Sequence, residues 1–339
     1  MRLLSVLYVA DYQARIGVAK RSLAVRKPAG TTQVPIEALE AVVLVGGQIT
    51  SEAIDLCVSH GVRVSALRRS GRVRFTIGPP RSGNVLLRVA QVRAADDPVA
   101  SAEVARPLVA AKLTSYRRLL VRWAADVERP QRHVLRSEAD VLTERVRALS
   151  GIVDGDHLRG IEGDGTRRYF KGLSIALEPA GAVGRFALRT RRPPRDPANA
   201  LLSFLYGLSL GEVVGALDSV GLDPQVGFLH GLRPGRPSLG LDLLEELRPL
   251  NDRFAVRVLR RHQLRLEHFV NTAAGAWYLS DEGRHRLLEA HEAERATQLF
   301  HPLLDRHIDR WTLPVVQATL LARHLRGDLP QYPPYVVSS

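Results

Sequence analysis

The sequence has little cysteine, little lysine and no long apolar run. Its single cysteine, Cys57, cannot form a disulfide within the chain, which is typical of a reducing cytoplasmic compartment. The N-terminus shows no apolar stretch followed by a small-residue cleavage site, and no run of about 18 apolar residues occurs anywhere. We therefore expect neither a signal peptide nor a membrane-spanning helix, and no membrane partner.

Arginine dominates the charged residues. Lys and Arg together number 48 against 35 Asp and Glu, which gives a formal net charge of +13. Lysine occurs at only a handful of positions, such as Lys20, Lys27, Lys112 and Lys171. The planar guanidinium group suits bidentate contact with phosphate, so this balance favours a nucleic acid partner. An arginine-rich composition can also reflect a GC-rich genome, and charge alone does not separate the two explanations.

The order of apolar patterns predicts an α+β protein in two parts. Short runs of Val, Leu and Ile near the start are typical of strands, and the later apolar spacings of three and four are typical of helices. The segment from Gly78 to Gly83, with two prolines and a serine, is the clearest linker signal. We expect a small, mainly β domain at residues 1–80, a linker at 81–96, a larger, all-helical catalytic domain at 97–327 and a proline-rich tail at 328–339.

Individual elements follow from the same patterns. Thr50 or Ser51 is a suitable N-cap for a short helix that Gly61 would end. The tail cannot form regular structure, and we expect it to reach onto a partner. Strands are predicted at residues 3–9, 16–25, 34–45, 62–67 and 73–77, the last two as a hairpin, and long helices at 101–126, 137–150, 155–178, 199–219, 239–270, 281–298 and 311–326.

A histidine in a glycine- and proline-rich segment precedes an acidic helix. Three glycines and two prolines lie between His230 and Leu241, which places His230 on a loop or a helix end, with Ser238 as N-cap of the next helix. On that helix Asp242, Glu245 and Glu246 share one face. The face is either the solvated side of an amphipathic helix or part of a cation site. Carboxylates with one imidazole suit Mg²⁺ or Mn²⁺.

A second segment combines Glu162 with three nearby glycines. Leu158, Ile161, Tyr169 and Phe170 have helical spacing, although each glycine costs roughly 1 kcal/mol in a helix interior. Such glycines are tolerated mainly where another backbone or a ligand comes close. A glycine-rich turn with a surface glutamate fits the segment as well, and by itself the segment specifies no chemistry.

Arginines gather in two stretches. They are either solvated basic loops or strips that bind phosphate. One stretch lies in the predicted hairpin, and the other lies around Pro193-Pro194, before a buried helix. The candidate DNA-binding residues are Arg68, Arg72 and Arg74 in the first stretch and Arg189, Arg191 and Arg192 in the second.

Three motifs together resemble one protein family. The first is Glu162-Gly163 with Tyr169-Phe170 a few residues later, which is weak alone. The second runs from Arg191 to Phe204 and contains Pro-Pro-x-Asp-Pro-x-Asn-Ala-Leu-Leu-Ser-Phe. The third runs from Gly227 to Pro249, with Gly-Phe-Leu-His at its start and Glu-Glu-x-Arg-Pro at its end. Over residues 1–325 the sequence resembles the endonuclease and integrase of CRISPR spacer acquisition, the first of the universal CRISPR-associated proteins.

The resemblance implies a site, an activity and partners. It implies Mg²⁺ or Mn²⁺ held by Glu162, His230 and Glu245, with Asp242 as a nearby essential carboxylate; the choice of Glu245 over Glu246 rests on the resemblance alone. It implies that the 3′-hydroxyl of a captured DNA fragment is joined to the CRISPR repeat. The implied partners are double-stranded or branched DNA, a second copy of the chain and the small ferredoxin-like second universal CRISPR-associated protein. The stretch Gly163-Asp164-Gly165 is looser than the helix expected after the glutamate.

Two other functions remain open from the residues. A non-enzymatic, architectural DNA-binding protein would keep the basic surface but would not depend on Glu162 or His230. A metal-dependent phosphodiesterase acting on another nucleic acid would use the same ligands, but it would not require duplex or branched DNA.

Overall fold

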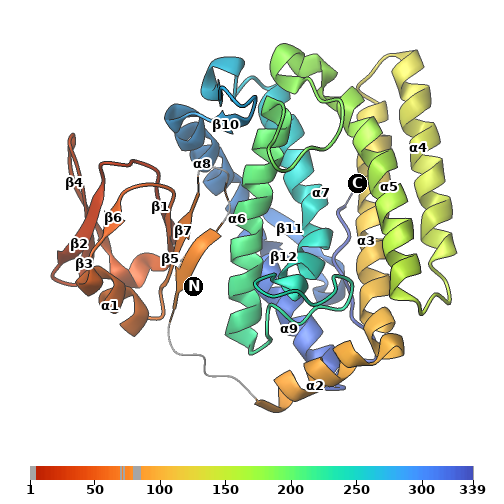
Figure 1. The fold of residues 1–339 in the computed structure, drawn as a ribbon, viewed down its shortest axis with the longest axis horizontal. Coiled ribbons are helices and arrows are strands. Elements are labelled where there is room, and N and C mark those ends of the chain that lie inside the picture. Colours follow the sequence, from red (N-terminus) through yellow and green to blue (C-terminus); the bar gives the residue numbers. More distant parts are fainter. Residues whose placement is uncertain (1–4, 69–70, 72, 79–84, 339) are drawn as a thin grey trace.

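A strand-rich domain and a helical domain lie side by side in the computed structural model, which describes residues 5–68, 71, 73–78 and 85–338 (Figure 1). This confirms the predicted α+β class, with a mainly β region followed by a mostly helical one. Among the sequence predictions, Arg72 and the first part of the predicted linker, residues 81–84, lie outside the described residues.

The N-terminal domain is built from two four-stranded sheets. One has the order β1-β5-β7-β8 and is parallel except for β8; the other has the order β4-β3-β2-β6. Apolar side chains such as Ile16, Leu23, Val42 and Val64 are fully buried in its core, together with Cys57 of the helix α1. The elements are β1 (Ser5–Val9), β2 (Arg15–Ala19), β3 (Ser22–Lys27), β4 (Gly30–Pro35), β5 (Leu39–Leu44), β6 (Gln48–Ile49), α1 (Ser51–Ser59), β7 (Arg63–Leu67) and β8 (Val73–Ile77).

The predicted hairpin is confirmed, and two predicted strands are each divided. Strands β7 and β8 pair antiparallel, and the Thr50 hydroxyl caps α1 by accepting from the Ala53 N–H at 3.3 Å. The predicted strand at 16–25 is two strands, because the chain turns at Lys20, whose φ is 55°. The predicted strand at 34–45 is interrupted because Pro35 has no N–H to continue a ladder, and a short 3₁₀ turn (Ile36–Ala38) follows.

Long helices form the C-terminal domain, with α3 packed against α4, α5 and α7. Residues in the second part of the predicted linker form α2. Helix α6 has a mean hydropathy of 1.7 over its most apolar window and the length to cross a membrane, but 67% of that window is buried inside the protein, as in a core helix. The helices are α2 (Val85–Asp96), α3 (Pro98–Ala124), α4 (Arg129–Ala148), α5 (Gly155–Leu177), α6 (Pro197–Val220), α7 (Ser238–Arg260), α8 (Asp281–Arg295) and α9 (Leu313–Leu325).

The prediction of an all-helical domain was too simple. Two short antiparallel hairpins lie within it, β9 (Phe269–Asn271) with β10 (Trp277–Leu279) and β11 (Gln298–His301) with β12 (Arg306–Asp309). The helix predicted at 239–270 ends at Arg260, and the chain turns at His262, whose φ is 53°. Most of both hairpins lies between the helices predicted at 239–270, 281–298 and 311–326, and the hydrogen bonds of each hairpin form between its two strands.

The tail forms no regular structure, as predicted, but it lies on its own chain. Tyr332, Tyr335 and Val337 are buried against the helical domain. The Val337 carbonyl accepts from Arg118 at 2.8 Å, and its N–H donates to the Ser115 hydroxyl at 3.1 Å. The expectation that this segment reaches onto a partner is therefore wrong for these residues, because their apolar surface is already covered by α3 and its neighbours.

Two glycines let the N-terminal hairpin approach α6 closely. Gly71, in the turn between β7 and β8, has a φ of 78°, and a Cβ on it would lie 2.7 Å from the Phe204 backbone. A Cβ on Gly207 would lie 2.1 Å from the Gly71 carbonyl oxygen. Arg63 also donates to the Gly215 carbonyl at 2.8 Å. These contacts fix the hairpin, and with it Arg68, beside α6.

Candidate active site

Glu162 lies on an unbroken helix rather than a loose turn. Helix α5 begins after Asp154, whose carboxylate accepts from two N–H groups of the first turn, and it continues to Leu177. A Cβ on Gly165 would lie 2.5 Å from a methyl of Leu113 on α3, so this glycine lets α5 approach α3 closely. The expected looseness after Glu162 is therefore wrong, because packing against α3 and α4 stabilises the helix despite its glycines.

Asp242 organises the loop that carries His230. Its carboxylate accepts the backbone N–H groups of Phe228, Leu229 and His230 at 2.6, 3.0 and 2.9 Å. Its Oδ1 also lies 2.7 Å from Nδ1 of the His230 ring. Gly227 makes this wrapping possible, since a Cβ there would lie 2.8 Å from the Asp242 carboxylate. With Nδ1–H donating to a carboxylate, Nε2 is the ring nitrogen left to accept.

Ser238 is not the N-cap that its position suggested. It is the first residue of α7, the N-cap is Pro237, and the Ser238 hydroxyl donates to the Gly231 carbonyl at 3.0 Å. The serine thus closes the loop after His230 instead of capping the helix. Together with Asp242 it places the imidazole over the first turns of α7.

Glu245 faces the same space as His230 and Glu162. Its Oε1 lies 3.9 Å from Nε2 of His230 and 3.1 Å from the Arg248 guanidinium. Burial alone would raise the pKa of Glu245, but Arg248, Lys112 and His230 together lower it to about 2. The carboxylate is therefore ionised at neutral pH, as a metal ligand requires.

Glu246, its neighbour in the sequence, faces away from this space. Its carboxylate accepts from the Tyr335 N–H at 2.5 Å, from the Gln317 amide at 2.9 Å and from the Tyr332 hydroxyl. Burial raises its pKa to about 8, although these three hydrogen bonds oppose the shift. Spacing on the helix did not separate the two glutamates, whereas their partners do. Glu246 anchors the tail and Glu245 points towards Glu162.

The ammonium group of Lys112 lies between the two glutamates. It comes from the middle of α3, is fully buried and pairs with Glu245 at 2.6 Å and with Glu162. Glu162 also accepts from the Thr166 hydroxyl at 2.8 Å. Sequence reasoning did not assign Lys112 to the site. The signal that could have found it is a lysine on the otherwise apolar face that Leu108, Ala111 and Leu119 define.

The donor types fit a divalent cation, although the side chains do not yet surround one. Within the described part of the chain, no three His, Cys, Asp or Glu side chains are arranged as metal ligands. Two carboxylates and one imidazole are nevertheless directed at one space, and a positive group already lies between the carboxylates. Glu162, His230 and Glu245 therefore supply the donor types that Mg²⁺ and Mn²⁺ accept.

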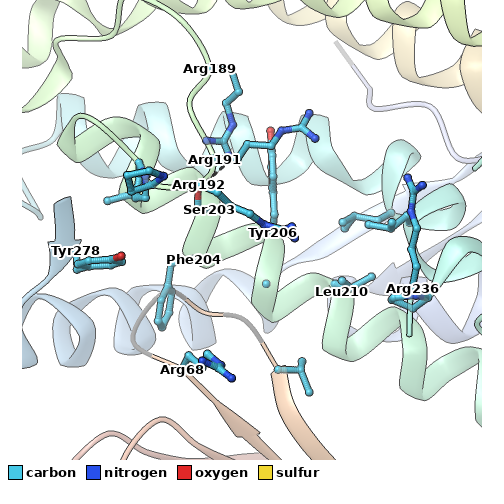
Figure 2. A pocket seen from close by; sticks show the side chains of 18 of the residues that line it. Arg68, Arg189, Arg191, Arg192, Ser203, Phe204, Tyr206, Leu210, Arg236 and Tyr278 are labelled. Atoms are coloured by element: carbon cyan, nitrogen blue, oxygen red, sulfur yellow. Dashed lines mark hydrogen bonds between the residues drawn. The ribbon is translucent and has the colours of Figure 1, made fainter. Parts of the chain in front are cut away.

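A large arginine-lined pocket adjoins these residues, with a volume of about 1170 Å³ (Figure 2). Arg68 enters it from the N-terminal sheet, Arg191 and Arg192 from the loop before α6, and Arg236 from the loop after His230. Phe204, Tyr206 and Tyr278 also line it, but only Tyr278 is partly exposed. Arg248 lines the pocket and also pairs with Glu245, so it links the pocket to the acidic cluster.

The predicted DNA-binding arginines do not form one group. Arg68, Arg191 and Arg192 are exposed in the pocket. Arg189 also borders it, but its guanidinium donates to Asn199 at 2.8 Å and to Ser203 at 3.0 Å. Arg74 is exposed beside Phe75 at a different hollow. Arg68, Arg191 and Arg192 thus have the most freedom to contact a ligand in the pocket.

Behind the pocket lies a buried polar group that the sequence did not reveal. The Arg248 guanidinium lies 5.0 Å from the centre of the Tyr206 ring, and the Tyr206 hydroxyl donates to Asp252 at 2.6 Å. Burial raises the pKa of Asp252 to about 6, although Tyr206 and the arginines Arg248 and Arg189 oppose the shift. Arg248 therefore contacts both this buried group and Glu245.

Known proteins share this sequence and fold. The family model described as "CRISPR associated protein Cas1" matches residues 7–293. A Rhodospirillum rubrum protein named CRISPR-associated endonuclease Cas1 2 is 40% identical over 310 residues, which cover 89% of each chain. A casposase bound to an integration product has a similar fold, with a TM-score of 0.83 at 21% identity over 100% of this chain and 96% of that one. So does a chain of a Cas6-RT-Cas1–Cas2 complex, with a TM-score of 0.83 at 22% identity over 100% of this chain and 37% of that one. This chain therefore belongs to the CRISPR-associated Cas1 family, whose curated relatives are named endonucleases.

Proposed function

We propose that this protein cuts and joins DNA strands in CRISPR spacer acquisition, with a divalent metal held by Glu162, His230 and Glu245. The observation that supports this most directly is the convergence of two carboxylates and an imidazole from three separate segments, next to a pocket lined by arginines. Mg²⁺ and Mn²⁺ suit this donor set equally. The family assignment supports the same activity.

In the proposed reaction, the 3′-hydroxyl oxygen of a captured DNA fragment forms a bond to a phosphorus of the CRISPR repeat. The attacking hydroxyl gives up its proton, the bond from that phosphorus to the 3′-oxygen of the adjoining nucleotide breaks, and the leaving oxygen takes up a proton, so that one phosphodiester replaces another. A bound divalent ion would supply positive charge to the scissile phosphate and the attacking oxygen. Asp242 orients His230 so that Nε2 faces Glu245, and Arg248 keeps Glu245 ionised.

The arginine-lined pocket is the proposed site for DNA phosphates. Arg68, Arg191 and Arg192 have exposed guanidinium groups from two different segments, and such groups hold phosphates without reading sequence. Tyr278, which is partly exposed in the pocket, offers a ring on which a base can stack. We propose double-stranded or branched DNA as the substrate and the cytoplasm as the compartment. The proposed protein partners are a second copy of this chain and a Cas2 protein, as in the complex of similar fold.

The test is cleavage and strand joining on a branched or repeat-containing duplex with Mg²⁺ or Mn²⁺. His230→Ala and Glu162→Ala are expected to abolish both reactions while DNA binding, measured by fluorescence anisotropy, stays unchanged. His133→Ala and Glu103→Ala, which change exposed residues of the same types on α4 and α3, are the matched controls.

Three results would contradict the proposal. If DNA cleavage and strand joining survive in both His230→Ala and Glu162→Ala, the proposed active site is wrong. DNA binding without strand chemistry under either metal would leave an architectural DNA-binding protein. Equal activity on single-stranded RNA and on duplex DNA would indicate a phosphodiesterase of broader range.

A further inference from the structure

Lys112 is a buried cation whose partners are the two proposed carboxylate ligands. Its side chain is fully buried, and its Nζ contacts Oε1 of Glu162 and lies 2.6 Å from Oε2 of Glu245. The Tyr116 ring, with its centre 5.4 Å from Nζ, covers another side of the ammonium. A buried ammonium is costly unless it is paired, so these two contacts decide where the side chain lies.

Two positively charged side chains already balance the charges of Glu162 and Glu245. Arg248 pairs with one oxygen of Glu245 and Lys112 with the other, and Lys112 also pairs with Glu162. A divalent ion bound to the same two carboxylates would lie within a few ångströms of the ammonium. At that separation like charges in a buried site repel strongly.

We infer that Lys112 is a positioning residue that takes the place of the divalent ion in the metal-free protein and is displaced when the ion binds. This inference rests on the proposed metal site. Without the ion, Lys112 keeps Glu162 and Glu245 close together. With the ion, the ammonium moves away from at least one carboxylate. Lys112 thereby weakens metal binding, because the ion must replace an existing ion pair.

The alternative role for Lys112 gives the opposite result. If the ammonium only held the carboxylates in the geometry that the ion needs, its removal would loosen the site and weaken metal binding. If the ammonium competes with the ion, its removal strengthens metal binding and at the same time destabilises the metal-free protein. The sign of the change in metal affinity therefore separates the two roles.

The experiment measures Mn²⁺ binding to the full chain by electron paramagnetic resonance of free Mn²⁺ and by calorimetry. Lys112→Met is expected to lower the Kd for Mn²⁺ by ~10-fold or more. Its melting temperature without metal should fall, and Mn²⁺ should raise it by more than in the wild type. Lys171→Met is the matched control, because Lys171 pairs with Glu138 but is 61% exposed on its side chain and lies away from the cluster. This control is expected to keep the wild-type Kd.

A higher Kd in Lys112→Met, with wild-type binding intact, would overturn the inference and leave the proposed function standing. Glu162→Gln and Glu245→Gln are expected to lose Mn²⁺ binding. A wild type that binds no Mn²⁺, or binding that survives both of these changes, would overturn the proposed metal site and the inference with it.

Should Lys112→Met fail to fold by circular dichroism, a crystal structure of the wild type with Mn²⁺ decides. Nζ is then expected beyond hydrogen-bonding distance of at least one carboxylate, and Nζ still bonded to both would overturn the inference.

Discussion

Nδ1 of His230 lies 2.7 Å from Oδ1 of Asp242, and the same carboxylate accepts three consecutive backbone N–H groups of the loop that carries the histidine. Asp242 is fully buried, and these bonds use both of its oxygens. It acts on the proposed metal site through His230, because it fixes the loop, the ring orientation and the tautomer at once. Groups that orient a metal ligand in this way commonly affect metal affinity almost as much as the ligand itself.

Replacing Asp242 therefore should damage both the fold and the metal site. Asp242→Ala leaves three N–H groups unpaired, two of them buried, and we expect it to lower the free energy of unfolding by on the order of 3 kcal/mol in urea titrations. Asp242→Asn keeps the shape, and we expect a Kd for Mn²⁺ raised by roughly 10- to 100-fold. Asp140→Asn, at an exposed position of α4, is the control. Wild-type metal affinity in Asp242→Asn would show that the His230 orientation does not depend on this carboxylate.

The close approach of the hairpin to α6 should tolerate no side chain at Gly207. A Cβ there would lie 2.1 Å from the Gly71 carbonyl oxygen, which belongs to backbone that cannot rotate away. We expect Gly207→Ala to lower the free energy of unfolding by about 1–3 kcal/mol. Gly160→Ala is the contrasting control, since no atom lies within 4 Å of its Cβ position on α5. That change should stabilise the protein by about 0.5–1 kcal/mol. Equal effects of the two substitutions would argue against a tight junction.

The tail should stabilise the helix that carries Glu245. The Tyr332 hydroxyl donates to Glu246 and accepts from Gln317 at 2.9 Å, all in a buried environment. Tyr332→Phe leaves these partners without the hydroxyl, and we expect a loss of about 1–3 kcal/mol in the free energy of unfolding. Tyr278→Phe, which changes a partly exposed tyrosine in the pocket, should leave the stability nearly unchanged. A stable Tyr332→Phe variant would mean that the tail contributes little to α7.

Asp252 should give the protein a pH-dependent stability of a defined sign. Burial raises its pKa from the ordinary value of 3.8 to about 6, so the native state holds this proton more tightly than the unfolded chain. The resulting stabilisation is fully present at a pH below the ordinary pKa of 3.8 and is lost as the pH rises to about 6. Between these limits the stability of the wild type relative to Asp252→Asn should fall by on the order of 3 kcal/mol in urea titrations. A difference that does not change with pH would show that the pKa of Asp252 is the same in the native and unfolded states.

Replacing some of the arginines that line the pocket should weaken DNA binding, whereas replacing Arg189 should lower stability. Arg191→Ala and Arg68→Ala are expected to weaken DNA binding, and each should reduce the slope of log affinity against log salt by ~1 for a lost phosphate contact. Arg189→Ala is expected to lower stability instead, by on the order of 2 kcal/mol, because the guanidinium hydrogen bonds to Asn199 and Ser203 are lost. Arg74→Ala, at a hollow that shares only Arg68 with this pocket, is the control for net charge. Fluorescence anisotropy at several salt concentrations measures the slope, and equal slopes for Arg191→Ala and Arg74→Ala would place the DNA elsewhere.

Sequence patterns predicted the helices better than the strands that interrupt them. Helices such as α5 and α6 are long, and their apolar spacing repeats over several turns, so a local pattern was sufficient. The short hairpins β9–β10 and β11–β12 have strands of only three or four residues. Strands this short show too few alternations to be recognised as strands by their pattern.

By itself, the sequence determined the order of the two domains, the basic character of the protein and the motifs that contain Glu162, His230 and Glu245. These are local properties, because each depends on residue types at short spacing. The tertiary structure alone decided that Glu246 faces the tail, that Arg189 is bonded to Asn199 and Ser203, and that Lys112 lies between the two glutamates. Helices that are far apart in the chain meet because their apolar faces pack together. The residue spacing within one helix does not predict which polar side chain of another helix will lie opposite it.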